Sequence, residues 1–344
     1  MRIQFLYSLI ACLLMFCSCM AQKSESTENS VWDNMLAYQL PNGGWSKQYV
    51  DGTAVDYKKK LSNDILKILP KEDRLATIDN RATTQEIEAL AEGFQKTSKK
   101  EYKEAVIRGI NYLLSAQYEN GGFPQYYPDT RGYRSQITFN DNAMINVLEL
   151  LRNVGKGDDA YDFIPGELSE KAQNAVQKGV GCILKAQVRI DNELTVWAAQ
   201  YDERLQPAQA RKFEPISLAA SESVGIVRFL MKEEPTGEIV QAIERAIKWF
   251  NHVKIEGYRF DTSRDAKGKM VRKLVPEDNA IVWSRFYEIG TNRPVFGDRD
   301  DTVHYNFDEI SEERKNGYSW YGEWPVNLLK NNYPKWLKSI HSKK

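Results

Sequence analysis

The sequence predicts a mainly α-helical protein in which three repeated helical hairpins form an α/α toroid, an (α/α)3-type barrel. Two observations predict this fold. Apolar residues recur at three- and four-residue spacing over most of the chain, as they do in amphipathic helices. In addition, a turn-like motif recurs three times, each time after a predicted helix. A ring of hairpins would gather these turns on one face, together with long loops and a few short strands, and we expect the functional site there.

The apolar spacing predicts six helices in order along the chain. In the first two, Ile87 and Leu90, and later Val106 and Ile110, lie about one turn apart on what would be a single helical face. Clusters of Gly, Pro and Asn separate the helices. The six predicted ranges are residues 83–94, 101–117, 142–154, 168–187, 217–230 and 238–253.

Beyond the sixth helix the helical spacing stops. Residues 256–279 form a charged stretch with Gly268 near its middle, which predicts a β-hairpin around a glycine turn. Residues 283–301 then crowd arginines and acids into an irregular segment, more of them than a solvated loop needs. Trp324 and Pro325 lead into a predicted terminal helix.

The repeated motif joins glycines, an aromatic residue and a Gln-Tyr pair. Residues 39–49 match residues 117–126, and a looser third copy covers residues 187–201. Each copy ends one predicted helix and precedes the next, so we interpret the unit as a helical hairpin whose connecting turn carries the motif. The glycines alone could be helix stops that need a positive φ. A helix stop does not require the repeated aromatic residue or the Gln-Tyr pair.

The charge balance limits the classes of partner. The 344 residues contain 47 Lys plus Arg and 47 Asp plus Glu, so the formal net charge is zero. No overall field would draw the chain to nucleic acid, and we expect none to bind. An acidic ligand would have to meet a local cluster of cations. Aromatic residues make up 11% of the chain, which is consistent with a surface that stacks on a cyclic ligand and equally with core packing.

Residues 1–21 predict an export signal. Arg2 is followed by an apolar run over residues 5–16 that is too short to span a bilayer as a helix. The residues before Cys19 resemble a loose bacterial lipobox, which would place a lipid on Cys19. Cleavage after Ala21 would instead release the protein. Both outcomes stay open.

The remainder of the chain is predicted to form one domain. Residues 22–30 are polar and predict a tether, and residues 31–344 predict a single catalytic domain. We therefore expect a monomer in the periplasm or on the outer-membrane surface of a bacterium, or a secreted protein. The only contact with a membrane that we expect is through the lipid on Cys19. Cys182 is the only cysteine outside the leader, so no disulfide is expected.

Two Asp-Asn pairs are candidate metal ligands. Asp79-Asn80 precedes one predicted helix, and Asp141-Asn142 precedes another about one repeat later. At equivalent turns the pairs would lie on one face, and their hard oxygen atoms suit Ca²⁺. Asp and Asn also cap helices, and this alternative stays open. A zinc site is not expected, because the chain has only three His and no cysteine cluster.

Five motifs resemble those of the family 10 polysaccharide lyases, the pectate lyases with an α/α toroid core. They appear in order, and the resemblance covers about residues 32–336. The motifs are Thr77-Ile-Asp79-Asn80-Arg81, Thr138-Phe-Asn-Asp141-Asn142, Trp197-Ala-Ala-Gln200-Tyr201-Asp202, Ala210-Arg211-Lys212-Phe213-Glu214-Pro215 and Trp283-Ser-Arg285-Phe-Tyr.

The resemblance implies Ca²⁺-assisted anti β-elimination of de-esterified homogalacturonan (polygalacturonate) to 4,5-unsaturated oligogalacturonides. It implies that Arg211 is the base that takes the C5 proton, and that Arg285 and Arg299 bind substrate carboxylates. Ca²⁺ would neutralise the neighbouring C6 carboxylate, which makes the C5 proton more acidic. The implied Ca²⁺ ligands are Asp79, Asn80 and Asp141.

The residues by themselves leave alternatives. Arg211 is close enough in sequence to form an ordinary ion pair with Glu214, and the other two arginines could pair with neighbouring acids. Two other function classes also remain. A non-catalytic carbohydrate-binding surface protein would need the aromatic residues but not Arg211, and a toroidal glycoside hydrolase would need an acid and a base, for which Asp141 and Asp202 are the candidates.

Overall fold

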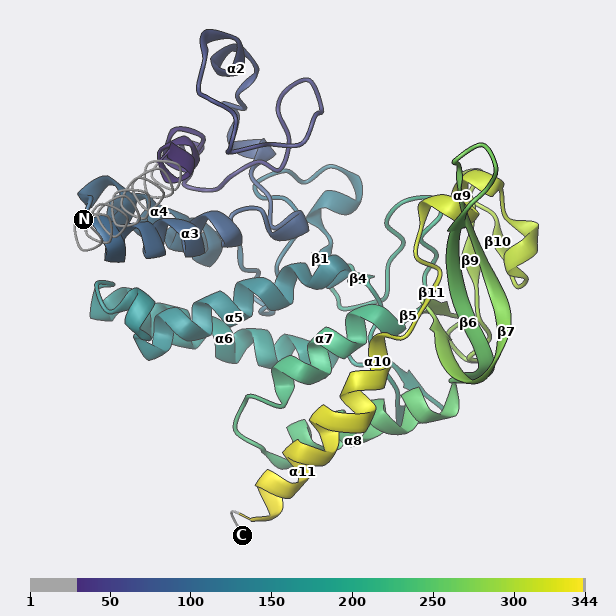
Figure 1. Cartoon of the computed structure of the whole chain (residues 1–344). Coiled ribbons are helices and arrows are strands. Elements are labelled where there is room, and N and C mark those ends of the chain that lie inside the picture. Colours follow the sequence, from purple (N-terminus) through teal and green to yellow (C-terminus); the bar gives the residue numbers. More distant parts are fainter. Residues whose placement is uncertain (1–29, 343–344) are drawn as a thin grey trace, which may run out of the picture.

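The computed structural model describes residues 30–342, and three antiparallel helical hairpins form its body (Figure 1). They pair α3 with α4, α5 with α6, and α7 with α8. The predicted mainly α-helical class is confirmed, and each helix begins and ends within three residues of its predicted bounds. The helices are α3 (Thr84–Thr97), α4 (Lys100–Ala116), α5 (Ala143–Lys156), α6 (Gly166–Ala186), α7 (Ala220–Leu230) and α8 (Gly237–His252).

The predicted leader and its Cys19 lipid site lie outside the described residues, as does the predicted tether except for Ser30. Residues 30–37 are helical and pack at the start of the body. Among the described residues, no helix combines the length and apolarity that crossing a bilayer requires.

Apolar side chains on the inner faces of the helices form one large core. Ile87 and Leu90 on α3 are fully buried, and so are Val106 and Ile110 on α4, as their spacing predicts. The burial of such side chains removes apolar surface from water and is the main force that holds the hairpins together. The core therefore fixes the helix ends from which the turns of the site emerge.

The glycine-rich turns connect successive hairpins rather than the two helices of one hairpin. The loop between α3 and α4 is only residues 98–99 and lies at the other end of that pair, because the two helices are antiparallel. The longer connection from α4 to α5 carries the glycines of residues 121–122. The prediction was wrong on this point because apolar spacing locates helices but does not say which neighbours pack.

The three motif copies make the same contacts. The side-chain amides of Gln39, Gln117 and Gln187 each donate to a carbonyl of their own turn and to one in the helix of the next repeat, at 2.8–3.0 Å. Trp45 and Trp197 each donate an indole N–H to a carbonyl near the end of the preceding helix, at 2.7 Å. These aromatic residues are fully buried, so they belong to the core and do not form a stacking surface.

A fourth copy of the motif, shorter than the others, has Trp283 as its aromatic residue. Its indole also donates to a helical carbonyl, that of Phe250, at 2.8 Å. Sequence comparison missed it because it lacks the glycines. All four copies share an aromatic residue followed four positions later by Tyr, which gives the pairs Trp45 and Tyr49, Phe123 and Tyr127, Trp197 and Tyr201, and Trp283 and Tyr287.

Main-chain hydrogen bonds join each copy to the next. The carbonyls of Trp45, Phe123 and Trp197 accept from the N–H groups of residues 77, 138 and 219, at 2.8–3.1 Å. The next N–H in each case donates to the carbonyl of the residue two positions after the aromatic residue of the following copy, which is Gln125, Ala199 or Arg285. Short antiparallel strand pairs result, with Ile137 opposite Tyr201 and Leu218 opposite Tyr287. The motif turns are therefore fastened into one continuous face.

The predicted β-hairpin is confirmed as β6 (Ile255–Arg264) and β7 (Met270–Ser284), with its turn at Gly268. A second, smaller apolar cluster lies beside it and includes Phe296, Phe307 and Trp320. The terminal helix also forms, as α10 (Trp324–Asn327), the π-turn η7 (Leu328–Asn332) and α11 (Tyr333–His341).

The remaining elements are short. The helical ones are α2 (Asn63–Ile68), η1 (Asp73–Leu75), η2 (Asp79–Arg81), η3 (Gly132–Ser135), η4 (Asn140–Asn142), η5 (Asp159–Tyr161), η6 (Phe307–Glu309) and α9 (Glu312–Gly317). The strands are β1 (Ile137–Thr138), β2 (Arg189–Ile190), β3 (Glu193–Leu194), β4 (Gln200–Tyr201), β5 (Leu218–Ala219), β8 (Phe286–Tyr287), β9 (Phe296–Gly297), β10 (Val303–His304) and β11 (Tyr321–Gly322).

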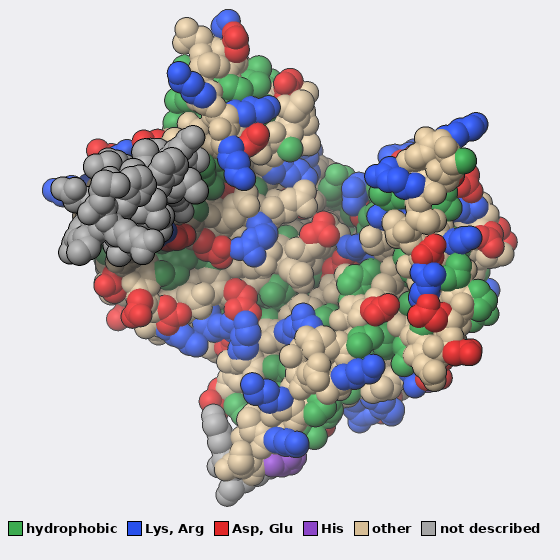
Figure 2. Space-filling view, viewed as in Figure 1, with side chains coloured by type: hydrophobic (Ala, Val, Ile, Leu, Met, Phe, Trp, Pro, Cys, Tyr) green, Lys and Arg blue, Asp and Glu red, His purple; other side chains and the backbone are tan. Residues whose placement is uncertain are grey.

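The outline of the molecule is hollowed between the lobe that carries α2 and the lobe that carries β6 and β7 (Figure 2). The short strands of the motif turns lie at the base of this hollow (Figure 1). Charged side chains of both signs line it. The predicted face of turns, loops and short strands is therefore a cleft.

Candidate active site

The two predicted metal-binding segments form matching turns that lie against each other. η2 and η4 are each a single helical turn whose middle residue is left-handed, with φ of 51° at Asn80 and 49° at Asp141. Asn and Asp adopt this conformation more readily than most residues. In this match Asp79 is equivalent to Asn140, and Asn80 is equivalent to Asp141. The match is shifted by one residue from the alignment of the two Asp-Asn pairs in the sequence.

Asp79 is buried at the base of the first turn. Its main-chain N–H donates to Thr77 at 3.1 Å, and its carboxylate contacts the ammonium group of Lys47. Burial alone would lower the pKa of Lys47, but the contact with Asp79 outweighs it and raises this pKa. Asn80 is exposed and lines a pocket of about 250 Å³ together with Lys47 and Glu86.

Asp141 is more open than Asp79, with 47% of its side chain exposed. Its carboxylate accepts a hydrogen bond from the Asn140 amide at 2.9 Å and lies 3.5 Å from a guanidinium nitrogen of Arg285. Arg285 is buried and also contacts Glu222, at the start of α7. The structure thus brings the predicted metal ligand Asp141 and the predicted substrate-binding residue Arg285 together.

Arg285 and Glu222 form a buried ion pair with spare hydrogen-bonding capacity. The Nε of Arg285 and the Oε2 of Glu222 have no hydrogen-bond partner in the described structure. Burial raises the pKa of Glu222, and the charge of Arg285 opposes this shift. For Arg285, burial acts to lower the pKa, but Glu222 and the nearby Asp141 outweigh it. Arg285 therefore remains a cation.

Tyr318 links the two sides of the cleft. Its ring centre lies 4.9 Å from the Arg285 guanidinium and 6.0 Å from that of Arg211. Its hydroxyl donates to Glu214 at 3.0 Å. Burial raises the pKa of Tyr318 well above its usual value, so the phenol stays protonated.

Arg211 is paired with Glu214, the contact that the sequence offered as an alternative. Its Nε donates to the Glu214 carboxylate at 2.8 Å, and its guanidinium lies 4.7 Å from the ring centre of Phe213. The hydrogen bonds to Glu214 raise the pKa of Arg211, while burial opposes the shift. A base needs the opposite shift, so the role of Arg211 as base stays a prediction that requires release from Glu214.

Arg299 also lies beside Phe213, with its guanidinium 5.3 Å from the ring centre. It forms a two-bonded pair with Glu313, both distances being 2.9 Å, and 61% of its side chain is exposed. The structure thus places Arg299 near Arg211. Asp202 begins a turn, where its carboxylate accepts from the main-chain N–H groups of residues 204 and 206.

The residues present fit Ca²⁺ by their chemistry. Within residues 30–342 no group of three or more His, Cys, Asp or Glu side chains could hold a metal ion. The predicted set needs no such group, because it combines the carboxylates of Asp79 and Asp141 with the amide of Asn80, all hard oxygen donors. In the described structure the positive charges of Lys47 and Arg285 balance the negative charges of Asp79 and Asp141. The Ca²⁺ site stays a prediction.

Sequence reasoning missed Lys47, Glu222 and Tyr318. Lys47 and Arg285 both lie two residues after the Trp of their motif copy, the first and the fourth, so a longer repeat comparison could have found Lys47. No sequence signal marks Glu222 or Tyr318, because their neighbours come from distant parts of the chain.

Comparison with known proteins places this site in a family. The family model for pectic acid lyase matches residues 39–329. A family 10 polysaccharide lyase from Cellvibrio cellulosa has a similar solved structure, with 35% sequence identity and a TM-score of 0.78, over 89% of this chain and 91% of that one. A mutant of that lyase in complex with trigalaturonic acid matches equally well, over 92% of its chain. No curated protein matches.

The match covers the turns, the motif copies and the arginine-rich loops described above. Its extent and the shared fold together decide the assignment. The chain belongs to the pectic acid lyase family, the family 10 polysaccharide lyases.

Proposed function

We propose that the chain is a Ca²⁺-dependent pectate lyase that cleaves polygalacturonate by anti β-elimination. The observation that carries the proposal is the meeting of Asp141 on η4 with the buried Arg285, which Tyr318 connects to Arg211. The solved complex of a related lyase with trigalaturonic acid supports an oligogalacturonate substrate.

Substrate binding depends on guanidinium groups in a chain whose charges balance. Arg285 is held by the buried Glu222 and approaches Asp141, so the remaining N–H groups at the edge of its guanidinium can donate to a uronate carboxylate. Arg299 is exposed beside Phe213 and can bind a second carboxylate along the polymer when its ion pair with Glu313 breaks. These two sites explain how a neutral protein holds a polyanion.

Arg211 takes the C5 proton of the galacturonate in the cleft. The C5–H electrons then form the C4–C5 double bond, the C4–O bond breaks, and its electrons leave with the oxygen. The neutral guanidine needed for this step is favoured by nearby positive charge and by removal of Glu214. A substrate that occupies the space beside Arg211 would displace Glu214, and the neutral guanidine is favoured where the substrate carboxylates pair with Ca²⁺ and the other arginines rather than with Arg211.

Ca²⁺ bound to Asp79, Asn80 and Asp141 would neutralise the C6 carboxylate of the substrate and so increase the acidity of the C5 proton.

The direct test measures ultraviolet absorbance of the unsaturated product when the mature protein is mixed with polygalacturonate and Ca²⁺. We expect absorbance to rise, and to stop rising in EDTA. Arg211→Ala should reduce the rate by a factor of about 10³ or more, because general base catalysis is lost. Arg204→Ala, which changes an exposed arginine in the same loop, should retain the rate.

Other outcomes identify the competing functions. New reducing ends without the absorbance rise would mean hydrolysis, with Asp141 and Asp202 as the residues to change. Polymer binding without either product would mean a carbohydrate-binding protein. An Arg211→Ala variant with normal turnover would exclude Arg211 as the base.

We also propose that the protein is exported and held by a lipid on Cys19. Labelling of the full chain with a radioactive fatty acid, and its loss in Cys19→Ala, tests this part separately from the enzyme activity.

A further inference from the structure

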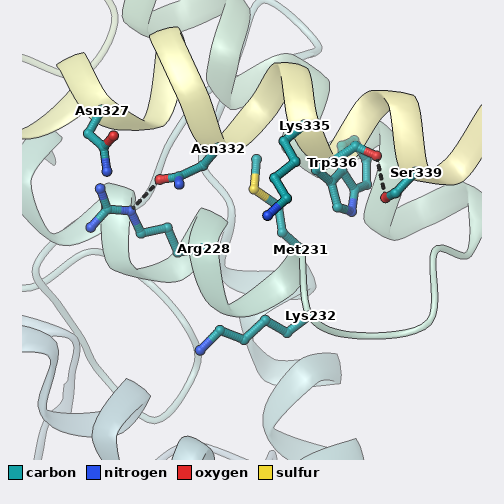
Figure 3. Close-up of a pocket in the computed structure, with 8 residues that line it drawn as sticks. All are labelled: Arg228, Met231, Lys232, Asn327, Asn332, Lys335, Trp336 and Ser339. Carbon is teal, nitrogen blue, oxygen red and sulfur yellow. Dashed lines mark hydrogen bonds between the residues drawn. The ribbon is translucent and has the colours of Figure 1, made fainter.

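A second pocket lies at the C-terminal end of α7, whereas Glu222 lies in the first turn of that helix. It opens between the last turn of α7 and the facing helices η7 and α11 (Figure 3). Its volume is about 600 Å³, within the range of pockets that bind small ligands or one or two sugar units. No part of the proposed elimination uses it.

The pocket has an excess of positive charge. Its lining includes Arg228, Lys232 and Lys335 and no acidic residue. Lys232 is neutralised by Glu149, at 2.8 Å. Arg228 donates only to the neutral amide oxygen of Asn332, at 3.1 Å, and neither Arg228 nor Lys335 pairs with a carboxylate anywhere in residues 30–342. Two cations are thus free to take an anion, in a chain whose charges otherwise balance.

The rest of the lining suits a sugar. Asn327 and Asn332 offer amides that can exchange hydrogen bonds with hydroxyl groups. Met231 lies between the two cations and supplies an apolar surface against which the C–H face of a pyranose ring can rest, while Trp336, which is mostly buried, lines the pocket beyond Lys335 (Figure 3). A ring that carries a carboxylate, hydroxyls and an apolar face has all three matching chemistries.

We propose that this pocket is a second binding site for polygalacturonate, which holds a uronate unit outside the catalytic cleft. The choice of polymer rests on the proposed function. Both sites can engage one long chain at once, and the second contact then acts at a high effective concentration. A trimer is too short to occupy both, so the pocket should matter only for long substrates.

The test compares Arg228→Gln/Lys335→Gln with the control Lys330→Gln/Lys338→Gln. The control removes the same charge from exposed lysines of η7 and α11 outside the pocket. We expect the KM for polygalacturonate to rise about tenfold in the pocket variant only, the effect of one lost charge-assisted contact. The kinetics with trigalacturonate should be unchanged in both. Affinity electrophoresis in gels with polygalacturonate should show the same loss of binding.

Three results would overturn the proposal. The pocket variant could match the control on the polymer, or it could lose activity equally on trimer and polymer. It could also keep polygalacturonate binding but lose binding to vesicles of phosphatidylglycerol, which would make the pocket a lipid site. The proposed function fails separately, if the wild-type protein forms no unsaturated product. Electrophoresis would still test the pocket in that case.

Discussion

Arg285 is the residue on which the site depends most, because it has one structural partner and one functional one. Glu222 lies below it in the core and Asp141 lies above it in the cleft. Removing Arg285 would therefore remove a substrate contact and also leave the buried carboxylate of Glu222 unpaired. These two effects can be separated.

We predict that Arg285→Gln destabilises the protein by about 3 kcal/mol, the scale of breaking a buried ion pair. Arg285→Gln/Glu222→Gln should recover most of this loss, since no buried charge is left. Affinity for trigalacturonate should fall by about 1–3 kcal/mol in both variants. Urea denaturation and titration calorimetry provide the two readouts. If the double variant also recovered substrate affinity, Arg285 would be only structural.

Glu86 gives the fold a dependence on pH. It is buried and accepts hydrogen bonds from Tyr57 and Gln85 at 2.8 Å, while its Oε2 has no partner. Burial raises its pKa from an ordinary 4.5 to about 7, and the hydrogen bonds oppose the shift. The folded state thus holds a proton that the unfolded state releases between these pH values, so stability should fall as pH rises through this range.

We predict that Glu86→Gln removes this dependence. The variant should gain about 2 kcal/mol over wild type between pH 5 and pH 8. Denaturation curves at the two pH values measure the difference. An equal difference at both pH values would show that Glu86 does not titrate in this range.

The candidate site was predictable where motifs mark it. Asp79, Asn80 and Asp141 follow from their repeated turns, and Arg211 and Arg285 from the family motifs. The partners that control the arginines were not predictable. Glu222 reaches Arg285, and Glu313 reaches Arg299, only through tertiary packing. A carboxylate at that distance in sequence gives no periodic signal.

At the scale of elements, the motif turns depend on close contact between backbones. Gly121 has a φ of +92°, and a Cβ there would lie 2.1 Å from the carbonyl oxygen of Lys178 on α6. Gly43 in the first copy has the same conformation and the same conflict, with Arg108 on α4. The glycines are thus needed both for positive φ and for this approach.

We predict that Gly121→Ala costs about 3 kcal/mol of stability, from strain and the backbone clash. Gly181→Ala is the matched control, because it lies in open space on α6. That change should leave stability unchanged or raise it by up to about 1 kcal/mol, since Ala favours helix. Thermal unfolding measures both. Equal melting temperatures would contradict the required close approach.

The elements themselves were largely predictable. Amphipathic spacing gave each helix of the body, and Gly268 gave the hairpin of β6 and β7. The pairing of the helices was not predictable, because each helix has two neighbours along the chain and its apolar face does not indicate which of them it packs against. The one-residue offset between η2 and η4 was also not predictable. The sequence pairs align Asp79 with Asp141, whereas the backbone turns align Asp79 with Asn140.

At the scale of the whole molecule, the cleft joins parts that lie far apart in the chain. Asp79 comes from the first third, Asp141 from the second repeat and Arg285 from the region after β7. A ligand that bridges them should therefore stabilise the folded state as a unit, since it binds only when all parts are in place.

We predict that Ca²⁺ at about a hundred times its Kd raises the melting temperature by about 5 °C. Asp141→Ala should lose this shift together with activity, and excess Ca²⁺ should restore both in part. Glu203→Ala, which removes an exposed carboxylate outside the proposed ligand set, should keep the shift. An undiminished shift in Asp141→Ala would place the ion elsewhere.

In the four motif copies the backbone and the side chains have different roles. Two residues after the aromatic residue of each copy stand Lys47, Gln125, Ala199 and Arg285. The carbonyl of each accepts a main-chain hydrogen bond, and those of Gln125, Ala199 and Arg285 join neighbouring parts of the face. Any residue with a carbonyl can make this bond, so the main-chain links between the copies do not depend on which side chain stands there. These positions can therefore vary in evolution: new substrate chemistry can be tried there while the backbone links between the turns are inherited unchanged.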